Sequence, residues 1–161
     1  MKDGALSVRM GEIAVARDEQ VLAAIGLGSC IGVALFDEQA RIAGLAHVLL
    51  PEPASGRDGS PGRFASTAVP ALLAAMEKAG AARSRIVAKM AGGASMFSGL
   101  SSSGIAAVGQ RNAAAVRRAL DQLGIPLVAE DVGGSWGRTI YVQPRDGTYV
   151  VSNVLREDVR L

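Results

Sequence analysis

Short apolar runs, each ended by a turn of glycine, proline or charged residues, recur along the sequence and permit few folds. Runs of this length predict β-strands, because helices and membrane spans need longer apolar patterns. Only two segments carry apolar residues at helical spacing. Two helices among many strands, with hairpins near both ends of the chain, predict an α/β or α+β fold with mixed sheet pairing.

Eight segments have the composition of strands. They are 6–16 (one or two short strands around Gly11), 21–25, 31–36, 41–50, 86–90, 125–130, 139–142 and 148–151. The chain at 31–50 predicts one hairpin. Asp146-Gly147 predicts a second one between the last two segments, because this dipeptide suits a tight turn.

The two helices are predicted at 64–79 and at roughly 110–123. Pro70 should lie in or near the first turn of the first helix, where a missing N–H is tolerated. Gly80 and Gly124 are natural C-terminal ends for the two helices. The loop at 51–63 is rich in proline and glycine and has no periodicity, so we expect it to be mobile or functional.

Size and composition exclude several classes of protein. At 161 residues we expect one domain spanning 1–161, and 49% hydrophobic residues exclude intrinsic disorder. The net charge is only +2 and the arginines are scattered, so the sequence lacks the basic cluster with stacking aromatics that nucleic-acid binders show. The N-terminal segment carries acids where a signal peptide needs an apolar stretch. We therefore expect a cytoplasmic protein that neither inserts into membranes nor binds nucleic acid.

The glycine-rich segment GLGSC at 26–30 invites comparison with phosphate-binding loops. A dinucleotide fingerprint would have a further glycine at the position of Ile31. A P-loop would end in Gly-Lys-Ser or Gly-Lys-Thr, and the sequence contains neither. The segment therefore does not predict a nucleotide site, and we expect no cofactor.

Cys30 and His47 are the only cysteine and the only histidine. A single cysteine excludes an internal disulfide and any multi-cysteine metal site. Glycines at 26 and 28 let the backbone turn sharply at Cys30 and aim N–H groups into one small space, where they can stabilise an oxyanion. A thiol needs a base beside it at neutral pH. A hairpin turn near 37–40 would place His47 directly opposite Cys30.

The same residues also permit a plain structural interpretation. A lone cysteine in an apolar stretch is usually an inert part of the core. A lone histidine after Gly44-Leu45-Ala46 fits a structural role with a hydrogen-bond partner. Ser29 either polarises the site or is simply a small residue that the turn tolerates. Spacing alone leaves both interpretations open.

Five blocks of sequence resemble the chemoreceptor glutamine deamidase family, CheD. The blocks are GLGSC at 26–30, His47 with Leu50-Pro51, KMAGGASMF at 89–97, VGQRN at 108–112 and AEDVGGSWGR at 129–138. The resemblance implies hydrolysis of particular receptor glutamines to glutamate and ammonia. It also implies a layered sandwich of mixed β-sheet with two main helices, similar to the catalytic domain of the cytotoxic necrotizing toxins.

The resemblance assigns roles to individual residues. It implies a catalytic pair of Cys30 and His47, with Gly28 and Ser29 supporting the turn and the oxyanion. The family has a threonine as third catalytic member six positions before the cysteine, where this sequence has Ala24. A third member orients the imidazole, which a backbone carbonyl also does, and Thr67 or Ser29 are further candidates.

The resemblance also implies partners. These are the cytoplasmic helices of chemoreceptors as substrate, a CheC-type phosphatase as regulator, and recruitment to membrane-bound receptor arrays. Ala24 leaves an alternative open, a catalytically weakened module that binds receptors and CheC. Trp136 lies between glycines and either anchors its loop or lines a partner surface.

Overall fold

The computed structural model describes residues 2–54, 59–95 and 107–161. The strands are β1 (Leu6–Ser7), β2 (Ile13–Arg17), β3 (Leu22–Leu27), β4 (Ile31–Asp37), β5 (Ile42–Val48), β6 (Val87–Gly92), β7 (Leu127–Val132), β8 (Arg138–Gln143), β9 (Thr148–Asn153) and β10 (Arg156–Arg160). The helices are α1 (Ala65–Lys78) and α2 (Val108–Gln122), with short 3-10 turns η1 (Pro61–Arg63) and η2 (Arg83–Arg85). The predicted loop at 51–63 extends into residues outside the described ranges.

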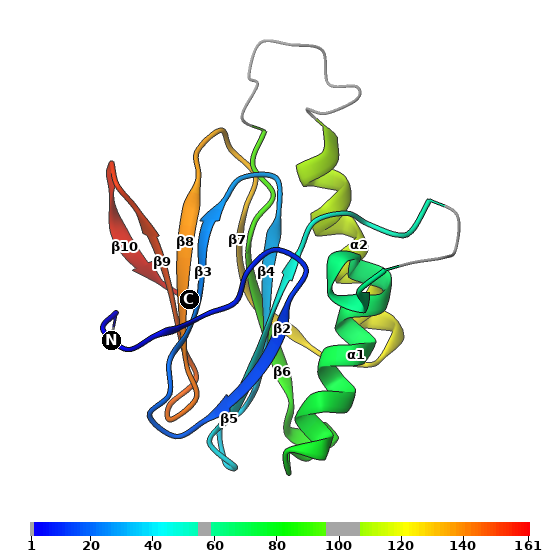
Figure 1. Ribbon diagram of the computed structural model, residues 1–161, viewed down its shortest axis with the longest axis vertical. Coiled ribbons are helices and arrows are strands. Elements are labelled where there is room, and N and C mark those ends of the chain that lie inside the picture. The colour runs from blue at the N-terminus through cyan, green and yellow to red at the C-terminus, as the bar shows by residue number, and fades with distance from the viewer. Residues whose placement is uncertain (1, 55–58, 96–106) are drawn as a thin grey trace.

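The strands form two five-stranded sheets. The central sheet has the order β2-β5-β4-β6-β7, and the outer sheet has the order β1-β3-β8-β9-β10. Each sheet is mixed, because β6 and β7 are parallel in the first and β1 and β3 are parallel in the second. Both helices cover the face of the central sheet that points away from the outer sheet (Figure 1). The predicted α/β fold with mixed sheets and two helices is confirmed.

The central sheet separates two apolar cores. Its strand β4 is buried on both faces, and its side chains alternate between the two. Ile31, Val33 and Leu35 pack under the helices, whereas Ala34 and Phe36 pack against the outer sheet. A side chain that contacts both sheets must therefore point into the core between them.

Both helices end as the sequence predicts. Gly80 and Gly124 have positive φ, +110° and +69°, and follow the last turn of each helix. In each case the glycine N–H and the next N–H bond back to carbonyls of that turn, which is a Schellman motif. The expectation for Pro70 is wrong. Because α1 begins at Ala65, Pro70 lies in the second turn rather than in or near the first.

One strand is shorter than predicted, and another was not predicted at all. The strand predicted at 41–50 ends at Val48, because the N–H groups of Leu49 and Leu50 both donate to the carbonyl of Arg63. Strand β10 was not predicted, since its sequence REDVR is charged and exposed and has no apolar run. It pairs with β9 at the edge of the outer sheet. No helix in the described ranges is long and apolar enough to cross a membrane.

Candidate active site

Cys30 lies directly before β4, in the connection that brings the chain from the outer sheet to the central sheet. Gly26 has φ +72°, a conformation that glycine adopts without strain, and its N–H bonds to the hydroxyl of Thr139. The Cys30 side chain is half-buried and packs at the margin of the core between the sheets. The sharp turn predicted before Cys30 is therefore present.

Three consecutive carbonyl groups of this turn are held by hydrogen bonds from other segments. Gly28 accepts from Ala94 N–H, Ser29 from Asn112 Nδ2 and Cys30 from Gly93 N–H, each at 2.9 Å. The segment after β6 also approaches closely, since a Cβ on Gly92 would lie 2.1 Å from the Cys30 carbonyl oxygen. The backbone that carries Cys30 is thus fixed from one side.

Fewer N–H groups than carbonyls of this turn have a hydrogen-bond partner in the described part of the chain. Within the described residues, no backbone acceptor is recorded for the N–H of Ser29 or of Cys30. Burial raises the pKa of the Cys30 thiol above its ordinary value, and a hydrogen bond from its own N–H opposes this rise. In the resting protein the thiol is therefore protonated at neutral pH.

His47 lies near the end of β5 and is buried. Its Nδ1 is 3.0 Å from the carbonyl oxygen of Val8. A carbonyl only accepts, so Nδ1 carries the proton and Nε2 presents a lone pair. Nε2 is buried and has no hydrogen-bond partner among the described residues. Burial lowers the pKa of His47, opposed by the Val8 hydrogen bond and the charge of Glu12, so the ring is a neutral base.

The segment that holds the ring also holds the backbone of His47. Gly11 N–H donates to the His47 carbonyl at 2.8 Å, and His47 N–H donates to the Glu12 carbonyl at 3.1 Å. Val8 is itself fixed, because its side chain is buried between the sheets and its N–H donates to Ala23 in β3. Three contacts from residues 8–12 therefore set the position of His47.

The register of the β4–β5 hairpin differs from the prediction. His47 lies opposite Gly32, not opposite Cys30. The loop is formed by residues 38–41, because Asp37 still pairs with Ile42 as the last residue of β4 and Arg41 closes the turn with φ +57°. The shift of two residues leaves Cys30 on the same face as His47.

This shift places Cys30, the residue directly before β4, diagonally across from His47 of β5. Cβ atoms in such positions are roughly 7–8 Å apart or slightly closer. In the part of the chain that the structure describes, no hydrogen bond joins the thiol to the imidazole. Both side chains nevertheless point into the space between the sheets, at the end of the central sheet where β4 begins and β5 ends.

The position of the family's third catalytic residue belongs to the apolar core in this protein. Ala24 is fully buried on β3, opposite Ile140, in the core between the sheets. Thr67 does not compensate, because its hydroxyl donates to the carbonyls of Pro61 and Phe64 at the start of α1. The carbonyl of Val8 is the group that holds the imidazole.

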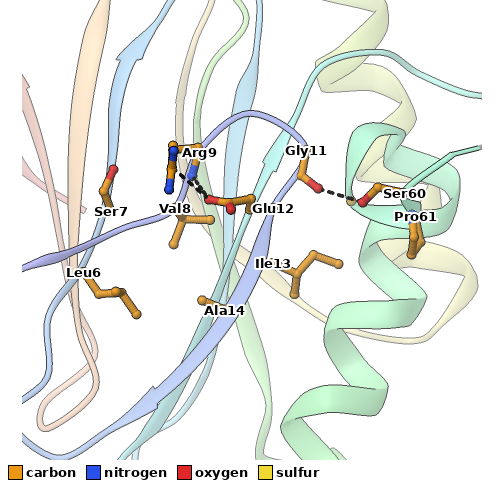
Figure 2. A pocket seen from close by; sticks show the side chains of 11 residues that line it. Leu6, Ser7, Val8, Arg9, Gly11, Glu12, Ile13, Ala14, Ser60 and Pro61 are labelled. Atoms are coloured by element: carbon orange, nitrogen blue, oxygen red, sulfur yellow. Dashed lines mark hydrogen bonds and ion pairs between the residues drawn. The ribbon is translucent and has the colours of Figure 1, made fainter.

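A cavity of about 530 Å³ lies beside the segment that holds His47 (Figure 2). Residues 6–9 and 11–14 form one side, and residues 60–62 form the other. Ser60 crosses it with a hydrogen bond from its hydroxyl to the Gly11 carbonyl at 3.0 Å. A second cavity of about 380 Å³ touches the Cys30 turn at Gly26, Leu27 and Gly28. Neither His47 nor Cys30 lines either cavity.

Comparisons with known proteins decide the family. Residues 49–153 match the family model described as CheD chemotactic sensory transduction. A probable chemoreceptor glutamine deamidase CheD from Symbiobacterium thermophilum is 46% identical over 96% of both chains. The chemoreceptor glutamine deamidase CheD from Halalkalibacterium halodurans is 44% identical over 86% of this chain and 87% of its own. The chain belongs to the CheD family.

The blocks that carry the CheD resemblance converge on the Cys30 turn. The described part of the block at 89–97 supplies Gly93 and Ala94, and the block at 108–112 supplies Asn112. The block at 129–138 supplies Arg138, which is buried and donates to the Gly92 carbonyl at 3.2 Å and to Asp131 at 3.3 Å. Residues 96 and 97 of the first block lie outside the described residues.

Trp136 of the last CheD block is half-buried between two arginines. The guanidinium groups of Arg156 and Arg138 lie 3.9 Å and 5.1 Å from its ring centre. These contacts connect the loop that precedes β8 with strand β10, as the anchoring interpretation expects. Within the described ranges, no group of three or more His, Cys, Asp or Glu side chains lies close enough to hold a metal ion.

Sequence reasoning missed two parts of this CheD site. The Val8 carbonyl is a main-chain atom, so no residue type marks it. Asn112 stands within the quoted block VGQRN, but a polar residue among helical positions gives no sign that it is buried. The signal available was its place in that block, four residues before the core residue Val116.

Proposed function

We propose that this protein hydrolyses specific glutamine side chains of methyl-accepting chemotaxis receptors to glutamate and releases ammonia. The names of the relatives, chemoreceptor glutamine deamidases, support this substrate and this reaction. One observation supports the chemistry most directly. His47 has its Nδ1 bonded to the Val8 carbonyl, and its Nε2 has no hydrogen-bond partner among the residues that the structure describes, on the same sheet face as the only thiol of the chain.

The first step joins Cys30 to the substrate. His47 Nε2 takes the proton of the Cys30 thiol, and the thiolate sulfur attacks the carboxamide carbon of the glutamine. Burial keeps both groups neutral before the step, so charge appears only when the proton moves. Because the two side chains are diagonal, the Cys30 side chain must turn along the strand toward His47 for the proton to move.

The oxyanion of the tetrahedral intermediate needs hydrogen-bond donors. We assign this role to the N–H groups of the turn at Gly28, Ser29 and Cys30. For Ser29 and Cys30, support comes from the fixed carbonyls of the residues before them, Gly28 and Ser29, because a peptide plane whose oxygen is held also holds the N–H that follows it.

The second step releases the products. The imidazolium of His47 returns its proton to the amide nitrogen, the carbon–nitrogen bond breaks and ammonia leaves. Water then attacks the thioester carbonyl, giving a proton to His47. The carbon–sulfur bond breaks, glutamate is left on the receptor and the thiol is regenerated. The Val8 carbonyl holds the imidazole through both steps, in the role that a threonine at position 24 has in the family.

A receptor fragment incubated with the protein tests this reaction. Deamidation replaces an NH₂ group by OH, so intact-peptide mass spectrometry detects it at each glutamine. We expect conversion by the natural protein and none by Cys30→Ser, with both proteins equally folded. Receptor binding without any mass change would instead support a regulatory module that binds receptors and a CheC-type phosphatase, for which the fully apolar surroundings of Ala24 are the supporting observation.

A further inference from the structure

Asn112 in α2 contacts the two strand ends that carry Cys30 and His47. Its side chain is fully buried. Its Nδ2 donates to the carbonyl of Ser29 at 2.9 Å and to the carbonyl of Leu49 at 2.8 Å. Both partners only accept, so the amide has one chemically consistent orientation. We call this pair of hydrogen bonds the Asn112 bridge.

The Asn112 bridge lies where the backbone ladder between β4 and β5 stops. The last residue pair at this end is Ile31 with Val48. Beyond that pair, Leu49 N–H turns to the carbonyl of Arg63 instead of to β4. The residue before Cys30 and the second residue after His47 are therefore connected through one side chain of a helix.

We infer that Asn112 is a positioning residue, which sets the separation of Cys30 and His47 for the reaction proposed above, on which this inference rests. The proton transfer between Cys30 and His47 is sensitive to that separation, because the two residues are diagonal neighbours and no direct cross-strand pairing fixes the distance between them. A misplacement of about 1 Å in reacting groups can cost about a hundredfold in rate. The Asn112 bridge holds both strand ends at the level of their backbones, so neither end moves without breaking a hydrogen bond.

The remaining polar atom of Asn112 fits this role better than a role in core packing. Oδ1 is buried and has no hydrogen-bond partner among the described residues. An apolar residue of similar size would fill the same volume without leaving an acceptor unpaired. The two N–H donors of the amide are the feature that an apolar residue cannot supply.

Alkylation of Cys30 by iodoacetamide tests the inference without a receptor, because the chain has one thiol. The variants are Asn112→Ala, His47→Ala and the double variant. Asn112→Ser, which keeps one donor, serves where Asn112→Ala does not fold. Val116→Ala is the matched control, since Val116 lies one turn further along α2, is fully buried and belongs to the core under the helices. Circular dichroism melting verifies that each variant is folded at the assay temperature.

We expect His47→Ala and Asn112→Ala each to slow alkylation at neutral pH by roughly tenfold or more. The double variant should be no slower than His47→Ala, because the effect of Asn112 passes through His47. Val116→Ala should stay within about twofold of the natural protein. On a receptor fragment, kcat should fall in Asn112→Ala while KM stays within about twofold.

Two results would overturn the inference while the catalytic pair stands. They are alkylation of Asn112→Ala at the natural rate, and slowing in the double variant equal to the product of the two single effects. An unchanged rate in His47→Ala would overturn the proposed pair, and the positioning role with it. The outcome for His47→Ala therefore distinguishes failure of the proposed mechanism from failure of the inference alone.

Discussion

At the scale of residues, main-chain atoms determine the state of His47. The carbonyl of Val8 fixes the tautomer, and the backbone contacts with Gly11 and Glu12 fix the position of the ring. A main-chain acceptor persists whatever the side chain at position 8, as long as its N–H stays bonded to β3. A buried alanine at position 24 is therefore compatible with an oriented imidazole.

Restoring a hydroxyl at position 24 should not improve the enzyme. Ala24 has no exposed surface, and added atoms in a packed core usually cost about 1–3 kcal/mol. The Nδ1 atom of His47 already donates to Val8. We expect Ala24→Thr to lower the free energy of unfolding and to leave turnover on a receptor fragment unchanged or lower. A several-fold gain in turnover would show that the Val8 carbonyl does not fill the orienting role.

The reactivity of Cys30 should shift toward higher pH in the folded protein. Only the thiolate reacts with iodoacetamide, and burial raises the pKa of the Cys30 thiol. We therefore expect the pH profile of the alkylation rate to lie at higher pH in the native protein than in the same protein unfolded by urea. A native profile at lower pH would mean that stabilisation of the thiolate outweighs the cost of burial.

At the scale of elements, the Asp37 side chain stabilises the end of the β4–β5 hairpin. The Asp37 carboxylate accepts from Arg85 at 2.8 and 2.9 Å and from the N–H groups of Ala82 and Ala40. These contacts hold Asp37 at the end of β4, next to the turn at residues 38–41. This turn belongs to the register that makes Cys30 and His47 diagonal.

Removing the charge of Asp37 should change how stability depends on pH. The hydrogen bonds from Arg85 lower the pKa of Asp37 to about 2, from 3.8. The stability that Asp37 contributes is therefore fully present above its unfolded pKa and is lost as the pH falls through about 2. We expect Asp37→Asn to cost about 1–3 kcal/mol at neutral pH, measured by urea unfolding.

The comparison of the two proteins below pH 4 provides the check. The natural protein should lose more stability than Asp37→Asn between about pH 4 and pH 2, because the other carboxylates are common to both proteins. Parallel curves over this range would contradict the assignment of the low pKa to Asp37.

At the scale of the whole molecule, the site forms where the two sheets come together. Gly32 of β4 allows this approach, since a Cβ at that position would lie 2.3 Å from the Ile140 side chain of β8. Tyr149 of β9 adds a hydrogen bond from its hydroxyl to the Gly32 carbonyl at 2.6 Å. Gly32 is also the residue opposite His47. The contact between the sheets is thus adjacent to the proposed base.

Removing the Tyr149 hydroxyl should weaken this contact. Tyr149 is fully buried, and burial raises its pKa well above 10, so the hydroxyl stays protonated and donates. We expect Tyr149→Phe to lower the free energy of unfolding by about 0.5–1.5 kcal/mol in urea. Tyr141→Phe on the neighbouring strand β8 is the control, with an expected change within about 0.5 kcal/mol because Tyr141 is only half-buried. Equal effects in the two variants would contradict the role of this hydrogen bond.

The local elements could be predicted from the sequence because their causes are local. Short apolar runs, the glycines after each helix and the Asp146-Gly147 turn depend on neighbouring residues, and the structure confirms the elements they predict. The selection of Cys30 and His47 as candidates depended on each being the sole residue of its type, on the glycines before Cys30 and on the resemblance to the CheD family. The charged strand β10 lay beyond such reasoning, since it forms by pairing with β9 rather than from its own pattern.

The geometry of the site was decided by the tertiary structure. The Asp37–Arg85 contact beside the hairpin turn joins residues 48 positions apart. The Val8–His47 and Asn112–Ser29 hydrogen bonds join residues 39 and 83 positions apart. Hydrogen bonds of this kind form only after the sheets and helices have packed, because packing brings their donors and acceptors together. The sequence by itself determined which residues carry the proposed chemistry, and long-range packing decided how they face one another.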